Sequence, residues 1–123
     1  MFDEVSTVDV LEKALTVIKT RGLARGQLED ENGCVCVYGA LRVAMGYDNH
    51  LSDSDPEFDN WPYDNYKNAD NALKRQIPID FKESHRRAAY YEGAMLWVYS
   101  DESLVSEVID LFEKTIRVEN KNA

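Results

Sequence analysis

At both ends of the chain, apolar residues recur every three or four positions, which is the pattern of an amphipathic helix. The first stretch predicts a helix from about Thr7 to Arg21, with Ser6 as its N-terminal cap and Gly22 as a left-handed stop. The last stretch predicts a helix from about Ser103 to Arg117, followed by a frayed polar tail at 119–123. The apolar positions are Val8, Leu11, Leu15 and Ile18 in the first and Leu104, Val105, Val108, Ile109, Phe112 and Ile116 in the last.

The least polar stretch is G-C-V-C-V-Y-G-A-L-R-V-A-M-G, in which Arg42 is the one charged residue. We expect it to form a helix from about Cys34 to Met45 that is buried on most of its circumference at the centre of the fold. Because its beginning is rich in valine, a short strand over 34–38 is the alternative. Gly39 inside a helix costs about 1 kcal/mol relative to alanine, and a close approach by another helix is the simplest compensation.

Three more stretches lie between the central and the last helix. A helix is expected from about Asp64 to Gln76 and ends before Pro78. Another is expected from about Phe81 to Tyr91, with Asp80 as its cap. The apolar run at 94–99 fits either a buried helix or a short extended segment. In the first of these helices the expected inward residues are Tyr66, Ala69, Ala72 and Leu73, and the expected outward residues are Lys67, Lys74 and Arg75.

The predicted fold class is therefore mainly α: a compact bundle of about five helices around the central apolar helix. The chain has 123 residues, of which 44% are hydrophobic and 30% charged. This length suits a single helical domain over residues 1–123. The stretches 23–33 and 47–63 are expected to be loops, and the second of them is long and acidic.

Acidic residues outnumber basic ones, 23 against 14, which gives a formal net charge of −9. A field of this sign opposes binding to nucleic-acid phosphates or anionic lipid and permits cationic partners. The chain has no apolar run as long as a membrane span, and its first residues lack the pattern of a signal peptide. The two cysteines are poorly placed to pair with each other, so reduced thiols and a cytoplasmic location are predicted. No cofactor is expected.

The chain resembles an uncharacterised family of small proteins from actinobacteria and their bacteriophages. Members carry a C-x-x-G-A-L-x-x-A segment and, before the last helix, a W-N-D-like motif. The second motif departs here, because Trp97 is followed by V-Y-S-D and Asp101 is expected to cap the last helix instead. The resemblance implies a phage or actinobacterial origin and no activity. The residues that match the first motif are Cys36, Gly39, Ala40, Leu41 and Ala44.

Two cysteines and two histidines are the candidate catalytic residues. Cys34 and Cys36 lie at the expected start of a helix, where the helix dipole lowers the pKa of a thiol. With His50 or His85 as a base, a small Cys-dependent hydrolase or transferase could be assembled. The alternative is that the cysteines are small packing residues of a buried helix, where free cysteine is most often found. A zinc site built from the same four residues is disfavoured by their spacing.

The acidic loop is the candidate binding segment, because it interleaves carboxylates with large rings, as a protein-recognition patch does. One alternative is a divalent-metal site. However, a calcium loop starting at Asp55 would have Asn60 where glycine is required and Tyr66 where glutamate is required. The preferred hypothesis is a non-enzymatic accessory protein that binds a protein partner, such as a basic host factor. The candidate contact residues are Asp53, Asp55, Glu57, Asp59, Trp61 and Tyr63.

Overall fold

The computed structural model describes residues 6–47, 49, 63–85 and 94–121. Within these ranges the chain forms six helices and no regular strand, so the predicted all-α class is confirmed. The helices are α1 (Thr7–Arg21), α2 (Val37–Ala44), α3 (Tyr63–Gln76), α4 (Ile79–Ser84), α6 (Ala94–Glu102) and α7 (Val105–Lys121).

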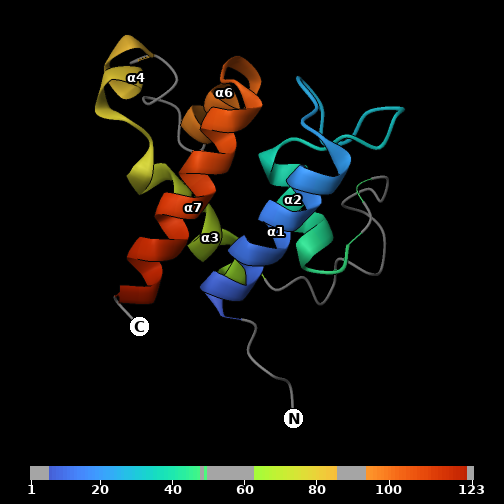
Figure 1. Ribbon diagram of the computed structural model, residues 1–123, viewed down its shortest axis with the longest axis horizontal. Helices are drawn as coiled ribbons and strands as arrows, with labels where there is room; N and C mark the ends of the chain where they lie inside the picture. The colour runs from blue at the N-terminus through green and yellow to red at the C-terminus, as the bar shows by residue number, and fades with distance from the viewer. Residues whose placement is uncertain (1–5, 48, 50–62, 86–93, 122–123) are drawn as a thin grey trace.

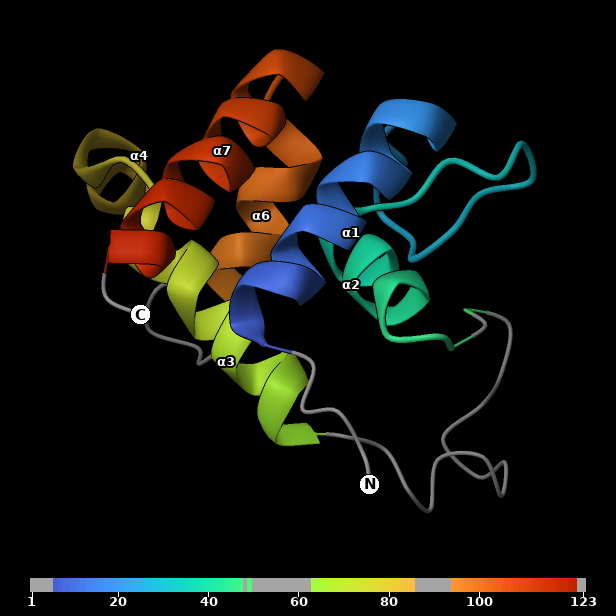
Figure 2. The ribbon, with the colours of Figure 1, turned by 60° about the horizontal axis from the view of Figure 1, so that its bottom comes forward.

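Helix α1 lies between α2 and α7, as both ribbon views show (Figures 1 and 2). It packs against α2, α3 and α7, while α2 packs against α1, α3 and α6. The side chains at the centre are aliphatic and aromatic, and those of Leu11, Leu41 and Phe112 have no solvent exposure. Within the described part of the chain, no helix combines the length and the apolar character that a membrane span requires.

The first helix has the predicted bounds and both predicted end signals. The Ser6 hydroxyl accepts a hydrogen bond from the backbone N–H of Asp9 at 3.1 Å, so it satisfies one of the free donors of the first turn. Gly22 follows with φ of 91°, and its N–H donates to the Ile18 carbonyl at 2.9 Å. Because positive φ is strained for residues with a side chain, glycine is suited to this stop.

Helix α2 begins at Val37, three residues later than predicted. Residue Cys36 has φ of −81° and ψ of 177°, which is extended backbone, and Val35 forms isolated β-bridges with Leu23 and with Glu29. The prediction of a helix from Cys34 is therefore wrong at its start. The alternative of a short strand over 34–38 is not formed either, because the residues before Val37 are extended with isolated bridges only and those from Val37 onward are helical. Residues 37–41 are buried, as expected of the apolar segment.

Helices α3 and α4 meet at Pro78. The first runs over Tyr63–Gln76, one residue longer at its start than predicted. The second begins at Ile79 with Pro78 as its N-cap, so the prediction that Asp80 caps it is wrong; Asp80 lies in its first turn. It ends at Ser84 because His85 leaves helical geometry with ψ of 42°. The predicted continuation toward Tyr91 is therefore interrupted here, and residues 86–93 lie outside the described ranges.

The last two helices resolve one open alternative and correct three predictions: the start of the last helix, its frayed tail and its cap. The apolar run at 94–99, which the sequence left open, is helical within Ala94–Glu102. Helix α7 starts at Val105 and reaches Lys121, so the tail is not frayed at 119–121. The Glu119 carboxylate there accepts a hydrogen bond from the Arg75 guanidinium at 2.9 Å, which ties the end of α7 to α3. The Asp101 carboxylate does not cap α7; it accepts the backbone N–H of Gly26 at 2.8 Å.

Candidate functional site

The connection between α1 and α2 folds back along its own final residues. The N–H of Val35 donates to the Gly22 carbonyl at 3.0 Å, and the N–H of Ala24 donates to the Val35 carbonyl at 2.9 Å. Further along, the N–H of Cys36 donates to the Leu28 carbonyl at 3.1 Å. These bonds between residues distant in sequence hold the segment before α2 extended. Both cysteines are therefore placed by the connection rather than by a helix.

Gly39 allows the backbone of the connection to pack directly against α2. A Cβ atom at this position would lie 2.0 Å from the Leu28 carbonyl oxygen and 3.2 Å from the amide nitrogen of Asn49. No side chain fits there. The expected close approach is thus real, but the approaching group is the backbone of the connection and not another helix. Glycine in the G-A-L motif is explained by this contact.

Cys36 is the N-cap of α2. Its sulfur accepts a hydrogen bond from the N–H of Gly39 at 3.4 Å, and the Ser100 hydroxyl accepts from the N–H of Val37 at 3.1 Å. The side chain of Cys36 is buried, and burial raises the pKa of its thiol. The donors at the start of α2 do not outweigh this burial. The thiol is therefore a neutral capping group, and the predicted activation by the helix dipole is wrong for it.

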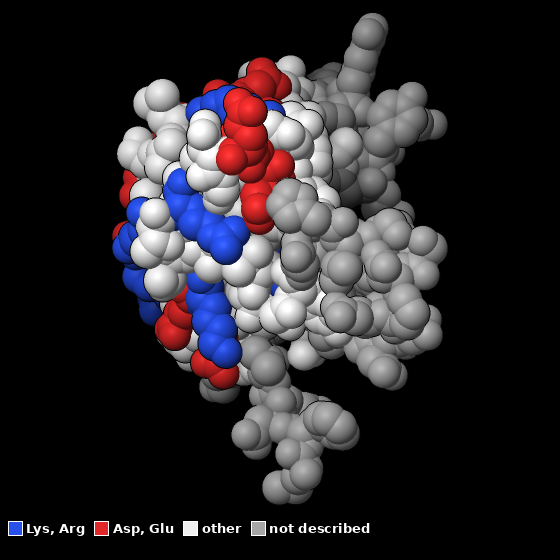
Figure 3. Space-filling view, turned by 90° about the vertical axis from the view of Figure 1, so that its right-hand side faces the viewer, with Lys and Arg blue, Asp and Glu red and all other residues white. Residues whose placement is uncertain are grey.

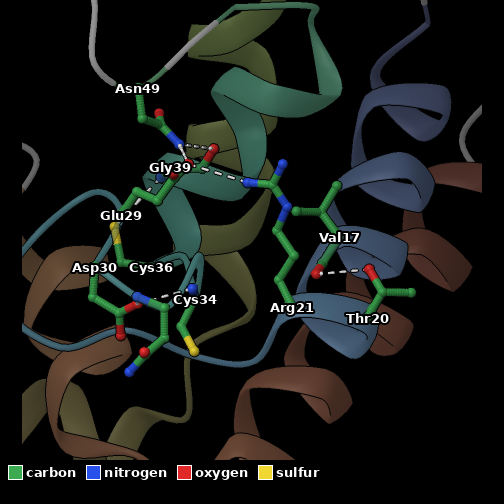
Figure 4. A network of polar contacts seen from close by, with 10 residues as sticks. Val17, Thr20, Arg21, Glu29, Asp30, Cys34, Cys36, Gly39 and Asn49 are labelled. Atoms are coloured by element: carbon green, nitrogen blue, oxygen red, sulfur yellow. Dashed lines mark hydrogen bonds and ion pairs between the residues drawn. The ribbon is translucent and has the colours of Figure 1, made fainter.

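Cys34, two residues earlier in the extended segment, is half-buried. Burial is the largest cause that raises the pKa of its thiol, and the nearby Asp30 carboxylate raises it further. That carboxylate accepts the backbone N–H groups of Cys34 and Asn32, both at 2.9 Å (Figure 4). A negative charge beside the sulfur opposes thiolate formation, so Cys34 also lacks the electropositive surroundings of a nucleophilic cysteine.

The histidines do not complete a catalytic pair in the described structure. The two ring nitrogens of His85 lie 2.9 Å from the Phe81 carbonyl oxygen and 3.2 Å from the Glu102 carboxylate, and the ring stacks on that of Phe81. This residue therefore joins α4 to α6 instead of acting on a thiol. His50, the other predicted base, lies outside the described residues.

Most of the predicted binding loop also lies outside the described ranges, including Asp53, Asp55, Glu57, Asp59 and Trp61. Tyr63 is the first residue of α3, and its side chain is not described. Its role as a contact residue stays a prediction. Among the residues that are described, no three His, Cys, Asp or Glu side chains gather closely enough to hold a metal ion.

A polar network covers the face of α2 that meets the connection. The Glu29 carboxylate pairs with the Arg21 guanidinium at 3.1 Å and accepts the amide N–H of Asn49 at 3.3 Å (Figure 4). The same amide nitrogen donates to the Gly39 carbonyl at 3.2 Å. The network thus joins the end of α1, the connection and the segment after α2. Cys36 meets this network through the hydrogen bond that its sulfur accepts from the N–H of Gly39 (Figure 4).

The sequence analysis missed a buried carboxylate on α3. Asp70 is only 3% exposed, and its oxygens accept from the Tyr38 hydroxyl at 2.8 Å and from the Lys74 ammonium at 2.9 Å. The Lys67 ammonium lies 3.5 Å away. Burial, followed by the Asp70 charge, raises the pKa of Tyr38 above its usual value, so the phenol stays a donor. Spacing places Asp70 on the same helix face as Tyr66 and Leu73, but it does not reveal the partner from α2 that makes its burial possible.

The tyrosine that bonds to this carboxylate packs against two further aromatic rings. The Tyr38 ring stacks on Trp97 with centroids 5.8 Å apart and lies tilted 6.0 Å from Tyr66. Lys67 and Lys74 are not simply outward, as predicted, because both neutralise Asp70 and both are partly buried. The arrangement joins α2, α3 and α6. It is a satisfied interior group with no free acid or base, and chemically it fits a structural role.

Three comparisons with known proteins gave one match, to a family model. Neither the curated proteins nor the solved structures contain a match to the chain. This family model covers residues 3–118, which include the extended cysteine segment, the buried carboxylate, the first five described helices and most of α7. The chain belongs to DUF6197, a family of unknown function.

Proposed function

We propose that this chain is a small acidic accessory protein that acts by binding a protein partner and not by catalysis. The observation that carries the proposal is the exposure of large apolar side chains on a highly charged molecule. Ile79 is 65% exposed, Leu104 is 66% exposed and Val105 is 41% exposed. Leu104 and Val105 are adjacent in the chain, and neighbouring exposed apolar side chains are typical of protein-interaction sites.

The charge of the chain defines the chemistry of the partner. With a net charge of −9, the protein attracts a basic partner and repels nucleic acid and anionic membranes. Figure 3 shows the side of the molecule where α2 and the connection lie; acidic side chains gather there in one patch, with basic side chains along its edge. The resemblance to actinobacterial and phage sequences makes a basic host protein in the cytoplasm the fitting partner.

The acidic loop is the first segment to test as the contact. The full chain and a variant with Asp53→Asn, Asp55→Asn, Glu57→Gln and Asp59→Asn are used for affinity capture from an actinobacterial lysate. We expect the variant to lose partners that the wild-type chain retains at physiological ionic strength, because electrostatic attraction is screened by salt but not abolished. Identical partners for the two chains would remove the loop as the contact. Calcium calorimetry on the same pair tests the metal alternative.

Catalysis by a cysteine is disfavoured by the raised pKa of both thiols. Native labelling with a thiol reagent tests this directly, with Cys34→Ala and Cys36→Ala variants to separate the two sulfurs. Cys36 should react only when the protein unfolds, and half-buried Cys34 should react more slowly than a free thiol at neutral pH. Rapid labelling of either one in the native state would revive the hydrolase or transferase hypothesis.

A further inference from the structure

A cavity of about 240 Å³ lies where the end of α3, the start of α4 and the first half of α7 meet. Its walls include Pro78, the ring of Tyr99 and the side chain of Leu111. This corner is on the side of α7 away from α1, as both ribbon views show (Figures 1 and 2). The cavity is therefore remote from the cysteine segment and from the polar network around Glu29.

Exposed apolar side chains flank this cavity. Ile79 directly follows the wall residue Pro78 and is 65% exposed. Leu104 is 66% exposed, and its backbone N–H donates to the Glu107 carboxylate at 2.8 Å. Because Leu104, Glu107 and Leu111 are spaced by three and four residues, they follow one face of α7. Ile79 and Leu104 thus each lie beside a residue of the cavity wall, Pro78 and Glu107 respectively.

The size of the cavity favours a protein ligand. Small-molecule sites in proteins enclose roughly 300–1,000 Å³, whereas this cavity has about 240 Å³. It can accept one or two side chains of a partner, in the way that the centre of an interface receives an anchor residue. The Tyr99 phenol and the Gln76 amide add polar groups at the wall that can bond to a backbone.

Carboxylates dominate the rim. Glu107, Asp110 and a single basic residue, Lys114, line the cavity from the same helix, α7, and exposed Asp80 follows Ile79 in the chain. A second copy of the chain would bring the same carboxylates against these ones, and like charges that face each other across an interface oppose association. A partner segment with lysine or arginine beside its apolar anchor has the complementary charge.

We propose that this cavity binds an apolar side chain of a partner protein segment whose neighbouring residues are lysine or arginine. The proposal rests on the proposed function, since it identifies the surface and the partner chemistry of the same binding role. Ile79 and Leu104 border the anchor, and Glu107 and Asp110 select the positive charges beside it.

The probe is a labelled amphipathic peptide of about 18 residues, with leucine at helical spacing and lysine elsewhere. Its binding to the full chain is measured by fluorescence anisotropy. Ile79→Ser combined with Leu104→Ser should weaken binding by about tenfold or more, the size expected of an anchor contact. Ile79→Leu combined with Leu104→Met keeps the apolar surface and should bind like the wild type. Circular dichroism confirms that each variant is folded, as expected for exposed positions.

Two further double variants distinguish the effect of the carboxylates at the cavity from the effect of the overall negative charge. Glu107→Gln with Asp110→Asn removes two carboxylates at the cavity, and Glu12→Gln with Glu31→Gln removes two exposed ones elsewhere. We expect the rim pair to weaken binding several-fold at low salt and the distant pair to change it little. Equal losses for the two pairs, or no dependence on Ile79 and Leu104, would overturn the proposal in favour of bulk attraction.

Two further outcomes also count against this surface. A peptide that does not bind the wild-type chain would overturn the proposed occupant. Self-association in sedimentation that disappears with the serine variant would assign the surface to a second copy. In both cases the lysate capture with the acidic-loop variant still tests the broader proposal of a protein partner, so the two failures are distinguishable.

Discussion

The connection before α2 and the corner around α4 are both irregular parts of a helical protein, but they use their polar groups differently. In the connection, backbone and side-chain groups bond to one another, as Val35 does to Gly22 and Cys36 to Leu28. Helix α4 has six residues, none of them buried, and it is joined to α6 through the rings of Phe81 and His85. We call the connection the closed region, because its polar groups bond to one another. We call the corner around α4 the open corner, because its apolar and charged side chains are available to a partner.

The difference teaches that position near a helix N-terminus does not by itself create a reactive site. The start of α2 carries two cysteines, yet its free N–H groups are already bonded to Cys36 and Ser100. The corner at α4 carries no nucleophilic thiol, yet its apolar side chains are unprotected from solvent. Hydrogen bonds between the backbone groups before α2 stabilise the fold. Apolar side chains exposed to solvent at α4 leave a surface on which a partner can bind.

We expect the largest loss of stability from Gly39→Ala, in the closed region. The added Cβ would lie 2.0 Å from the Leu28 carbonyl oxygen, so the connection must move. We expect a loss of about 3 kcal/mol or more in the free energy of unfolding, measured by denaturant titration. Gly46→Ala is the control, because a Cβ there meets no atom within 4 Å and only the positive φ of 87° is strained. Similar losses for the two variants would contradict the steric explanation.

Asp70→Ala should lower the free energy of unfolding by the next largest amount, about 2–3 kcal/mol. The variant leaves the Tyr38 hydroxyl and the Lys74 ammonium without their shared acceptor in a largely buried place. Thermal and urea unfolding measure the loss. Exposed Asp64, in the first turn of the same helix, gives the matched control Asp64→Ala, which should change stability by less than about 1 kcal/mol. An unchanged midpoint for Asp70→Ala would show that the buried carboxylate is not structural.

Arg25→Met tests how the connection is held to α6. The Arg25 guanidinium donates to the carbonyls of Ser100 at 3.4 Å and Ser103 at 2.7 Å, and also to that of Asp101, at the end of that helix. Methionine keeps the apolar stem and removes these bonds, so we expect a loss of about 1 kcal/mol. The control is Arg117→Met on the exposed surface of α7. Faster amide exchange at Gly26 in the Arg25 variant would locate the effect in the connection.

The smallest effect is expected at the open corner, from the titration of His85. The bond to the Phe81 carbonyl, followed by the Glu102 carboxylate, raises the pKa of His85. The resulting stabilisation is present below the unfolded pKa of about 6.5 and is lost as the pH rises through the higher folded value. The melting temperature of the wild type relative to His85→Gln should therefore decline from mildly acid to mildly alkaline pH. Glu102→Gln should lessen this decline, and a flat difference would contradict the pairing.

Local signals made some elements predictable. Helix α1 has the predicted bounds because its cap, its apolar spacing and its terminal glycine all lie within the helix or next to it. The start of α2 was misplaced because Val35 is held extended by Gly22, Ala24 and Glu29, partners that lie 6 to 13 positions earlier in the chain. The length of α7 was underestimated because Glu119 is ordered by Arg75 from another helix.

The candidate site was only partly predictable for the same reason. The sequence placed both cysteines in the apolar helix, whereas the structure has Cys36 as its N-cap and Cys34 in the extended segment before it. The alternative of buried packing cysteines anticipated the burial that raises the pKa of both thiols, but not the contribution of Asp30. The burial of Asp70 depends on Tyr38 from α2, which helical spacing on α3 alone cannot reveal. The contact roles of Asp53 and its neighbours stay predictions.

The Leu28 carbonyl against Gly39 also fixes where the chain tolerates added length. Residues added between Gly22 and Leu28 would shift that carbonyl and disturb α2. By contrast, Glu31 and Asn32 are exposed at the tip of a turn in which the N–H of Gly33 donates to the Asp30 carbonyl. An epitope tag or a reporter peptide inserted between Glu31 and Asn32 should therefore be accommodated, which offers a labelling point far from the surface proposed to bind a partner.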